Sequence, residues 1–370
     1  MSLFFIPAFL LLFVYGVILL WLARGFSKTS CEKFTGAANL PLTLIVCARN
    51  EEKSIATCIR GILQQDYALQ FIQFILVNDA STDATRLLAE KELQQSGIDY
   101  TILNNSEHLG KKKSITSAIS LAKHELLVMR DADTFTASSN WLSSLVTFYL
   151  HHTSDLIIAP LKLADASGVL WALQAIENNV LSLMAAGSAY YQKPFLCNGA
   201  NMAFKKSVFQ KVGGFARHAQ IPSGDDVLFM EDVKKIAGSK IDYLKCEESI
   251  VSTYSQTSFG PLLRQKVRWA SKFKSNQNKL NRLLALLSVL VNVFFLIALW
   301  QLLMGTGAQR ESALFVVFKL VIDFLLLFLA SSSIKNKHVW WYVIPISFLY
   351  PFYAGIIALL SVIATPKWNR

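Results

Sequence analysis

The sequence predicts an α/β domain with a mainly parallel central sheet, held between helices that cross a membrane. Three observations lead to this class. The 370 residues are 53% hydrophobic and only 16% charged, which is too apolar for an ordinary soluble protein. Residues 24–282 nevertheless have a soluble character and alternate short apolar strands with amphipathic helices. The excess of 36 Lys and Arg over 25 Asp and Glu fits a membrane protein facing an anionic leaflet, and argues against a nucleic-acid partner.

The most apolar residues are concentrated at the two ends of the chain. Residues 3–22 form an uncharged run of 20, about the length that crosses the hydrocarbon core. A signal peptide is the alternative, but the run lacks a basic start and a small-residue cleavage site, so we expect an N-terminal anchor over residues 1–23. The C-terminal membrane region, residues 283–370, contains further apolar runs at 283–304, 312–330 and 338–363.

Two features inside these C-terminal runs stand out. Lys319 and Asp323 lie four residues apart and therefore on one face of a helix. Charges at this depth are usually paired inside a helix bundle, and a role in a membrane pump or channel is the remote alternative. Pro345 and Pro351 interrupt the last run and predict a kink or a partly re-entrant segment.

Basic residues next to the apolar runs predict the orientation in the membrane. They flank the soluble domain on both sides, namely Arg24, Lys28, Lys33, Lys279 and Arg282. Because basic flanks stay on the cytoplasmic side, we expect the domain 24–282 in the cytoplasm, at the inner membrane of the cell. Lys367 and Arg370 favour the opposite orientation for the last run.

Strands and helices alternate through the first half of the soluble domain. Apolar, β-rich runs predict strands at 42–47, 71–77, 100–103 and 125–129. Helical periodicity predicts the intervening helices at 54–65, 85–95 and 115–123. This alternation is typical of βαβ units with a mainly parallel sheet. Ligands of such sheets bind at the carboxyl ends of the strands.

Acidic residues follow three of these strands at their carboxyl ends. Glu51 and Asp79 follow the first two strands, and Asp131 and Asp133 follow the last. Packing alone hardly explains three acidic loops at one edge of a sheet. Two carboxylates separated by one residue can face one cation, and Mg²⁺ or Mn²⁺ prefers carboxylates completed by phosphate oxygens. A solvated turn is the alternative for an isolated pair of this kind.

Seven short motifs occur in order along the chain: IVCARNEE, ILVNDASTD, HLGKKKS, VMRDADT, CNGANMAF, SGDD and QKVRW. Together they resemble the membrane-bound inverting glycosyltransferases of family 2, the relatives of cellulose, hyaluronan and poly-N-acetylglucosamine synthases and of ceramide glucosyltransferase. The resemblance covers about residues 40–275. It implies a GT-A nucleotide-diphospho-sugar transferase fold with a mainly parallel central sheet, joined here to about four transmembrane helices.

The resemblance assigns a donor side to the expected site. Glu51 and Asp79 match positions that hold the nucleotide base and ribose, for which carboxylates are suitable acceptors. Lys111 matches a lysine near the nucleotide, although a solvated basic face is the alternative for this run of three lysines. Asp131 and Asp133 match the motif that binds the metal and the diphosphate.

The resemblance also assigns an acceptor side. In the segment CNGANMAF, Asn198 or Asn201 would bond sugar hydroxyls, and Gly199 would allow close approach of the backbone. Packing is the alternative explanation of this segment. Gln265, Arg268 and Trp269 share one helix face.

Arg268 would then pair with the diphosphate, Trp269 would stack on a sugar ring, and Gln265 would lie at the acceptor. The same residues also fit an amphipathic helix on the membrane surface. The two interpretations are compatible, because such a helix would place the site against the bilayer.

A pair of carboxylates provides the expected base. Asp225 and Asp226 match the acidic triplet of the family, and Asp226 would take the proton from the acceptor hydroxyl. Asp225 would make it a stronger base through like-charge repulsion. Glu231 and Asp232 form a competing pair. We favour Asp226 because a glycine predicts a loop before it, whereas the following residues read as a helix with Glu231 on its exposed side.

The resemblance implies an inverting glycosyltransferase that moves a sugar from a nucleotide-diphosphate sugar, a UDP-sugar in the first place, to a membrane-associated lipid or lipid-linked glycan. Mg²⁺ or Mn²⁺ is the expected cofactor. A processive polysaccharide synthase is the first alternative, although such enzymes typically have more spans than are counted here. A non-catalytic membrane subunit that binds nucleotide or glycan is the second. The sequence makes no prediction of the oligomeric state.

Overall fold

A computed structural model of the chain describes residues 5–29, 39–221, 224–271, 278–334 and 337–363. The predictions made on Lys33, Lys367 and Arg370 lie outside this part. The chain divides into two compact units. We call them the sheet unit, formed mainly by Thr29–Ala164 and Ser188–Tyr254, and the membrane unit, formed by Met1–Lys28, Asp165–Gly187 and Ser255–Pro366.

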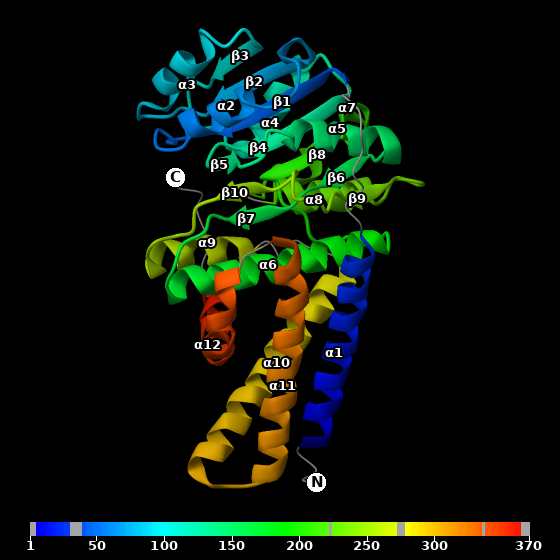
Figure 1. Cartoon of the computed structure of the whole chain (residues 1–370), viewed down its shortest axis with the longest axis vertical. Coiled ribbons are helices and arrows are strands. Elements are labelled where there is room, and N and C mark those ends of the chain that lie inside the picture. Colours follow the sequence, from blue (N-terminus) through cyan, green and yellow to red (C-terminus); the bar gives the residue numbers. More distant parts are fainter. Residues whose placement is uncertain (1–4, 30–38, 222–223, 272–277, 335–336, 364–370) are drawn as a thin grey trace. The chain divides into compact units, whose positions relative to one another are not determined.

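A mostly parallel sheet forms the centre of the sheet unit (Figure 1). Within the described residues it has seven strands in the order β3-β2-β1-β4-β8-β6-β9. The strands are β1 (Leu42–Ala48), β2 (Ile72–Asn78), β3 (Asp99–Asn104), β4 (Leu126–Asp131), β6 (Leu156–Ile158), β8 (Asn201–Lys205) and β9 (Ile241–Tyr243). β1 to β4 pair in parallel, whereas β8 runs antiparallel to both β4 and β6. β1 and β2 are buried along nearly their whole length, as expected for strands covered on both faces.

Six helices within the described residues surround this sheet. They are α2 (Ile55–Leu63), α3 (Thr85–Leu93), α4 (Lys111–Leu121), α5 (Trp141–His152), α7 (Lys206–Lys211) and α8 (Asp225–Val233). Short 3₁₀ turns are η1 (Leu69–Phe71) and η2 (Ala216–His218). The core between sheet and helices is apolar and includes the fully buried residues Leu44, Phe74, Val128 and Trp141. Burial of this surface is the main force that holds the strands at fixed positions.

The predicted α/β class is confirmed, and the four predicted strands agree with β1 to β4 within two residues at each end. One helix boundary differs. α4 begins at Lys111, four residues before the predicted start. Gly110 precedes it with φ +84, a conformation that favours glycine, and this turns the chain directly into the helix. The lysine run therefore belongs to the first turn of α4.

A second, small sheet lies next to the end of β4. It contains β5 (Thr134–Thr136), β10 (Val251–Thr253) and β7 (Leu161–Leu163), in the order β5-β10-β7. Thr253 of β10 donates its hydroxyl to the backbone oxygen of Asp133 at 3.1 Å. The turn between β4 and β5 is thus fixed from both sides.

Four helices of the membrane unit are long and apolar enough to cross a membrane, which agrees with the predicted number. They are α1 (Phe5–Lys28), α10 (Lys279–Met304), α11 (Gln309–Ile334) and α12 (Val343–Ile363, preceded by the 3₁₀ turn η4, Lys337–Tyr342). α12 continues as a helix through Pro351. Lys319 and Asp323 form an ion pair along α11, as is usual for charges at this depth.

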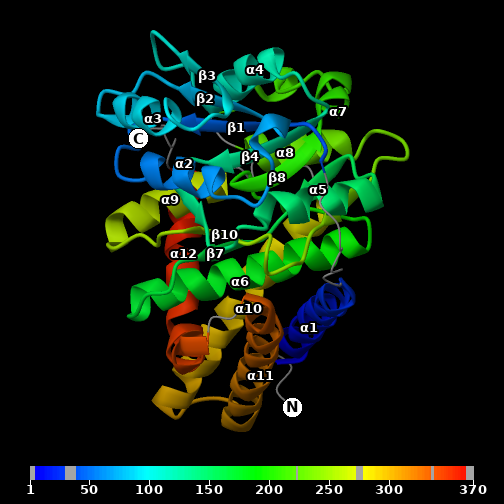
Figure 2. The same ribbon diagram turned by 45° about the horizontal axis from the view of Figure 1, so that its top comes forward.

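Two more helices complete the membrane unit. α6 (Val169–Tyr190) contributes its residues up to Gly187, and α9 is Phe259–Ser271. α6 runs across one end of the spanning helices (Figures 1 and 2). It approaches α1 so closely that a Cβ atom on Gly187 would lie 2.1 Å from the backbone oxygen of Leu22. Only glycine fits at this crossing, as at other close helix contacts in membrane proteins.

Candidate active site

The carboxyl ends of three neighbouring parallel strands bring the predicted donor-side acids to one edge of the sheet. β1 lies between β2 and β4, and Cys47 near the end of β1 is in register with Asp131, the last residue of β4. Glu51 follows β1, and Asp79 follows β2. The topology therefore places the acidic loops side by side, at the edge where sheets of this kind bind ligands.

Lys111 is the centre of the site. Its Nζ atom donates to Oδ1 of Asp131 at 2.7 Å and lies 3.1 Å from Oδ2 of Asp225. Burial alone would lower the pKa of Lys111, but the charges of Asp131 and Asp225 outweigh it and hold the pKa well above its ordinary value. The ammonium group therefore stays charged and joins two acids that are far apart in the sequence.

Gly199 closes the other side of this arrangement. Its backbone N–H donates to Oδ2 of Asp226 at 3.2 Å. A Cβ atom at Gly199 would lie 3.3 Å from Oδ2 of Asp225 and 3.5 Å from Nζ of Lys111. A side chain here would therefore crowd the charged atoms. We call Lys111, Asp131, Gly199, Asp225 and Asp226 the lysine–carboxylate cluster.

Asp225 and Asp226 lie in the first turn of α8, where the sequence predicted a loop before the helix. Gly224 has φ +84 and precedes the helix, so the glycine marks the helix start. Asp226 also accepts from the N–H of Val227 at 2.7 Å through Oδ1. The free N–H groups and the dipole at a helix start favour carboxylates at this position.

The competing pair, Glu231 and Asp232, is engaged in ion pairs elsewhere on α8. The Asp232 side chain is 0% exposed and pairs with His218 at 2.8 Å and Lys235 at 2.7 Å. Burial alone would raise its pKa, but hydrogen bonds from Lys235 and His218 lower it. Glu231 pairs with Lys234 at 3.1 Å. This geometry favours Asp226 over the competing pair.

Asp79 differs from the contact role expected for it. Oδ1 accepts from Nδ2 of Asn105 at 2.8 Å and the N–H of Leu109 at 2.9 Å, while Oδ2 contacts His108 at 2.7 Å and accepts from the N–H of Gly110 at 2.9 Å. Burial alone would raise the pKa of Asp79, but these hydrogen bonds lower it.

With both oxygens engaged twice, the acceptor capacity of the Asp79 carboxylate is filled by the protein itself. The carboxylate fixes the loop that leads into α4. It therefore acts on the site through the position of Lys111, and we revise its expected contact with the nucleotide accordingly.

Asn201 also differs from expectation. Its side chain is 0% exposed, donates to the backbone oxygens of Pro160 and Ser249 at 2.8 Å each, and accepts from Nε1 of Trp141 at 3.0 Å. It cross-links buried parts of the sheet unit, so we withdraw it as a sugar contact. Asn198 is half-buried, and its Oδ1 accepts from the N–H of Ala200 at 3.0 Å.

Two of the predicted acids are partly exposed. Glu51 lies in the loop after β1, where its Oε2 accepts from the hydroxyl of Ser54 at 2.8 Å. Asp133 lies in the turn that Thr253 holds by its backbone oxygen. Both remain on the strand-end edge of the sheet.

Sequence reasoning missed one contributor, Arg130. It is 2% exposed, and it donates from Nε to Oγ1 of Thr134 at 2.9 Å and from Nη2 to the backbone oxygen of Thr134 at 2.8 Å. The Thr134 hydroxyl donates in turn to the backbone oxygen of Asp131 at 2.6 Å. Arg130 thus closes the turn that carries Asp131 and Asp133. A charged residue inside the apolar run LLVMRD was the available signal.

The residues of the QKVRW motif lie on α9, in the membrane unit. Trp269 is 37% exposed, and Gln265 and Arg268 are half-buried. Lys266, between them, is buried and pairs with Glu177 of α6 at 2.6 Å. The predicted amphipathic character is therefore present, but with one of the basic residues turned inward.

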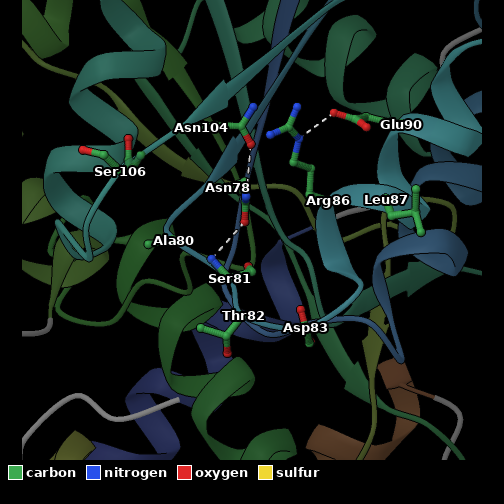
Figure 3. A pocket seen from close by; sticks show the side chains of 11 residues that line it. Asn78, Ala80, Ser81, Thr82, Asp83, Arg86, Leu87, Glu90, Asn104 and Ser106 are labelled. Atoms are coloured by element: carbon green, nitrogen blue, oxygen red, sulfur yellow. Dashed lines mark hydrogen bonds and ion pairs between the residues drawn. The ribbon is translucent and has the colours of Figure 1, made fainter.

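A cavity of about 590 Å³ opens at the ends of β2 and β3 and the start of α3 (Figure 3). Its polar lining includes Asn78, Asn104, Ser81 and Arg86. No residue of the lysine–carboxylate cluster lines it. We therefore place the chemistry at the cluster.

The donor set at the cluster is suitable for a hard divalent cation. Among the described residues, no group of three or more His, Cys, Asp or Glu side chains forms a ready cation site. The Asp131 side chain is 34% exposed and presents carboxylate oxygens at the surface of the site. One or two carboxylates completed by phosphate oxygens and water are the usual ligands of Mg²⁺, so these residues fit such an ion.

Residues 43–213 match the family Glycosyl transferase family 2. Among curated proteins, the chain is similar to an uncharacterized glycosyltransferase of Haemophilus influenzae, with 32% identity over 211 residues, which are 54% of this chain and 62% of the relative. It is also similar to an N-acetylglucosaminyltransferase of Bradyrhizobium diazoefficiens, with 21% identity over 239 residues, 61% of this chain and 47% of the relative. The matches thus span less than two thirds of the length of these relatives.

Among solved structures, the chain resembles a mannosyltransferase from Pyrobaculum calidifontis in complex with GDP-Man and Mn²⁺. The TM-score is 0.59 at 15% identity, and the match covers 96% of both chains. At this identity the likeness shows the fold, which is the GT-A-like α/β fold. The chain therefore carries a glycosyltransferase domain of family 2, attached to four helices that can span a membrane.

Proposed function

We propose that the protein is an inverting glycosyltransferase that moves a sugar from a nucleotide-diphosphate sugar to a lipid or lipid-linked glycan at the membrane. The observation that carries the proposal is the lysine–carboxylate cluster. It joins Asp131 at a strand end, where a diphosphate would bind, to Asp226, a carboxylate held by the N–H of Gly199. A base and a charge-stabilising group are thus kept next to each other.

In this mechanism Asp226 accepts the proton of the acceptor hydroxyl. The hydroxyl oxygen forms a bond to the anomeric carbon while the bond from that carbon to the diphosphate oxygen breaks. Attack from the opposite side inverts the anomeric configuration, and the nucleotide diphosphate leaves with the bonding electron pair. Lys111 stays protonated, so its charge can stabilise the negative charge that develops on the leaving group.

We propose that Asp131 and Asp133 hold Mg²⁺ or Mn²⁺ when the donor is bound. The cation would neutralise charge on the diphosphate leaving group. Arg130 and Thr253 support this role because they fix the turn that carries both aspartates. The Mn²⁺ bound with GDP-Man in the similar mannosyltransferase is consistent with it.

The donor is expected to be a UDP- or GDP-sugar. The similar protein of Bradyrhizobium diazoefficiens is named an N-acetylglucosaminyltransferase, and the similar solved structure holds GDP-Man. The four candidate spans favour an acceptor that is itself in the membrane. Basic residues beside the spans, such as Arg24, Lys28, Lys279 and Arg282, favour a cytoplasmic sheet unit at the inner membrane.

The test is a transfer assay on the purified full chain. Each member of a panel of UDP-, GDP- and dTDP-sugars is supplied with Mn²⁺ and membrane lipids, and the release of nucleotide diphosphate and the glycosylated product are measured. Nuclear magnetic resonance of the product reports the anomeric configuration. Product length separates a single transfer from the processive synthesis of a polymer.

Asp226→Asn should lower transfer by roughly 10³-fold, because a positioned general base contributes about 10²–10⁴-fold. Binding of the donor should remain. Glu231→Gln is the matched control on the same helix, since Glu231 pairs with Lys234 on α8. Full activity of Asp226→Asn, or a retained anomeric configuration, would refute the proposal.

A further inference from the structure

Two polar residues of α6 bind the segment that forms α9. Gln174 is 4% exposed, and Glu177 follows it three residues later on the same side of the helix. Both belong to the membrane unit, together with α9 and α12. Polar groups at such positions cost free energy unless they are paired, so their partners indicate what they hold in place.

Gln174 binds the backbone just before α9. Its Oε1 accepts from the N–H of Gln256 at 2.9 Å, and its Nε2 donates to the oxygen of the same residue at 3.0 Å. The amide therefore pairs with both backbone groups of Gln256, in the manner of a neighbouring strand. This fixes the chain three residues before α9 begins.

Glu177 binds α9 itself. Its Oε2 lies 2.6 Å from Nζ of Lys266, a residue that is only 6% exposed. The same Nζ lies 4.5 Å from the centre of the Trp269 ring, within the range of a cation–π contact. Tyr353 of α12 lies beside Glu177. One carboxylate thus determines where Lys266 lies, and the ammonium group of Lys266 packs on Trp269.

A buried ion pair is a poor source of stability, because apolar residues of similar volume often stabilise as well or better. It does favour one orientation, since an unpaired buried charge is strongly unfavourable. Lys266 and Trp269 are one turn apart, and Arg268 is their neighbour. Any rotation of α9 that separates Lys266 from Glu177 would therefore move Arg268 and Trp269 as well.

We infer that Gln174 and Glu177 are positioning residues of the transfer reaction. They hold α9 in the one rotation and height at which Arg268 and Trp269 serve the donor and the acceptor. The inference rests on the proposed function and adds to it two residues outside the matched motifs. Lys266 is the link between Glu177 and the Trp269 ring.

The test compares Glu177→Gln with the charge-swapped double variant Glu177→Lys/Lys266→Glu. We expect kcat/KM for the acceptor to fall about 10–100-fold in Glu177→Gln, since a misplacement near 1 Å can cost about 10²-fold. Donor binding should change less than threefold. The swapped pair should recover at least part of the loss, because it restores the attraction between α6 and α9. Lys319→Met is the control, because it also removes a buried ion pair of the membrane unit but lies on α11.

A second measurement does not depend on activity. The fluorescence of Trp269 is obtained as the difference between each protein and the same protein with Trp269→Phe, and its quenching by acrylamide is measured. Glu177→Gln should change this quenching, and Lys319→Met should not. An unchanged signal in Glu177→Gln, or an equal loss of activity in the control, would overturn the inference. Absence of any transfer by the unaltered protein would instead refute the proposed function.

Discussion

The ends of β2 and β4 offer a direct comparison within one sheet. Both strands end in an aspartate at the same edge, Asp79 just after β2 and Asp131 at the end of β4. Asp79 is 2% exposed, and both its oxygens are engaged by groups of the following loop. The Asp131 side chain is 34% exposed and contacts the mobile end of one long side chain, Lys111.

The difference shows that an acid at a strand end can serve a site in two ways. Asp79 organises backbone, and the backbone then places Lys111 at the start of α4. Asp131 presents an oxygen to a cation, which is the lysine here and can also be a metal ion with its diphosphate. The comparison separates an acid that acts on folding from an acid that acts on ligand binding, and four predictions follow from it.

The largest effect is expected for Asp131→Asn. Transfer should fall roughly 10³-fold, since the metal ion stabilises several kcal/mol of charge in the transition state and would lose a ligand. The thermal midpoint should change little, because the side chain is partly exposed. Calorimetric titration of Mn²⁺ with nucleotide diphosphate measures the loss of binding. Unchanged Mn²⁺ affinity would place the metal elsewhere.

Lys111→Met should have the next largest effect. Without the ammonium group, Asp131 and Asp225 face each other uncompensated, and the leaving group loses a stabilising charge. Transfer should fall roughly 10²-fold, the usual cost of removing one preorganised electrostatic group. Lys113→Met, in the same lysine run, is the control. Equal activity of the two variants would remove Lys111 from the proposed mechanism.

Asp79→Asn should mainly weaken the fold around the loop 105–110. Its hydrogen bonds to a charged group contribute about 1.5–3 kcal/mol each at most, so a loss of roughly 2 kcal/mol in local stability is expected. Hydrogen exchange of the peptide 104–113, followed by mass spectrometry, measures this opening. Activity should fall less than in Lys111→Met. If exchange is unchanged while donor binding is lost, Asp79 contacts the nucleotide after all.

The smallest effect is a dependence on pH. Because the pKa of Asp79 is lowered in the folded protein, its stabilisation is complete above its unfolded pKa of about 3.9 and is lost as the pH falls through the folded value. The difference in exchange between the unaltered protein and Asp79→Asn should therefore be full at neutral pH and shrink below about pH 4. Asp99→Asn, at an exposed ion pair, should show no such trend.

Much of the fold follows from local patterns. The strands near Ile45, Ile75 and Val128 are short apolar runs, and their periodicity and spacing imply parallel neighbours. The spans follow from length and composition alone. The start of α4 was missed because the residues Lys111 to Lys113 are read as solvated surface unless the turn at Gly110 is recognised.

The site was harder to predict because the sequence does not show where a side chain finds its partners. Asn201 and Asp225 both lie in short polar motifs, yet one is locked in the core by three hydrogen bonds and the other faces Lys111. The pairing of Glu177 with Lys266 joins residues 89 positions apart, and periodicity carries no information at that separation. Tertiary contacts decide such cases.

The reversed direction of β8 has a consequence for how the domain can be recombined. Because β8 is antiparallel to β4, its first residue, Asn201, lies beside Arg130 near the end of β4. The segment with Gly199 thus reaches the site just before a strand, whereas Asp131 reaches it just at the end of one. The pairing between β8 and β4 is made by backbone groups, which any sequence provides. Residues 188–254 are therefore an exchangeable block, and a chimera with the corresponding block of a relative would bring a new glycine and carboxylate pair to an unchanged Lys111.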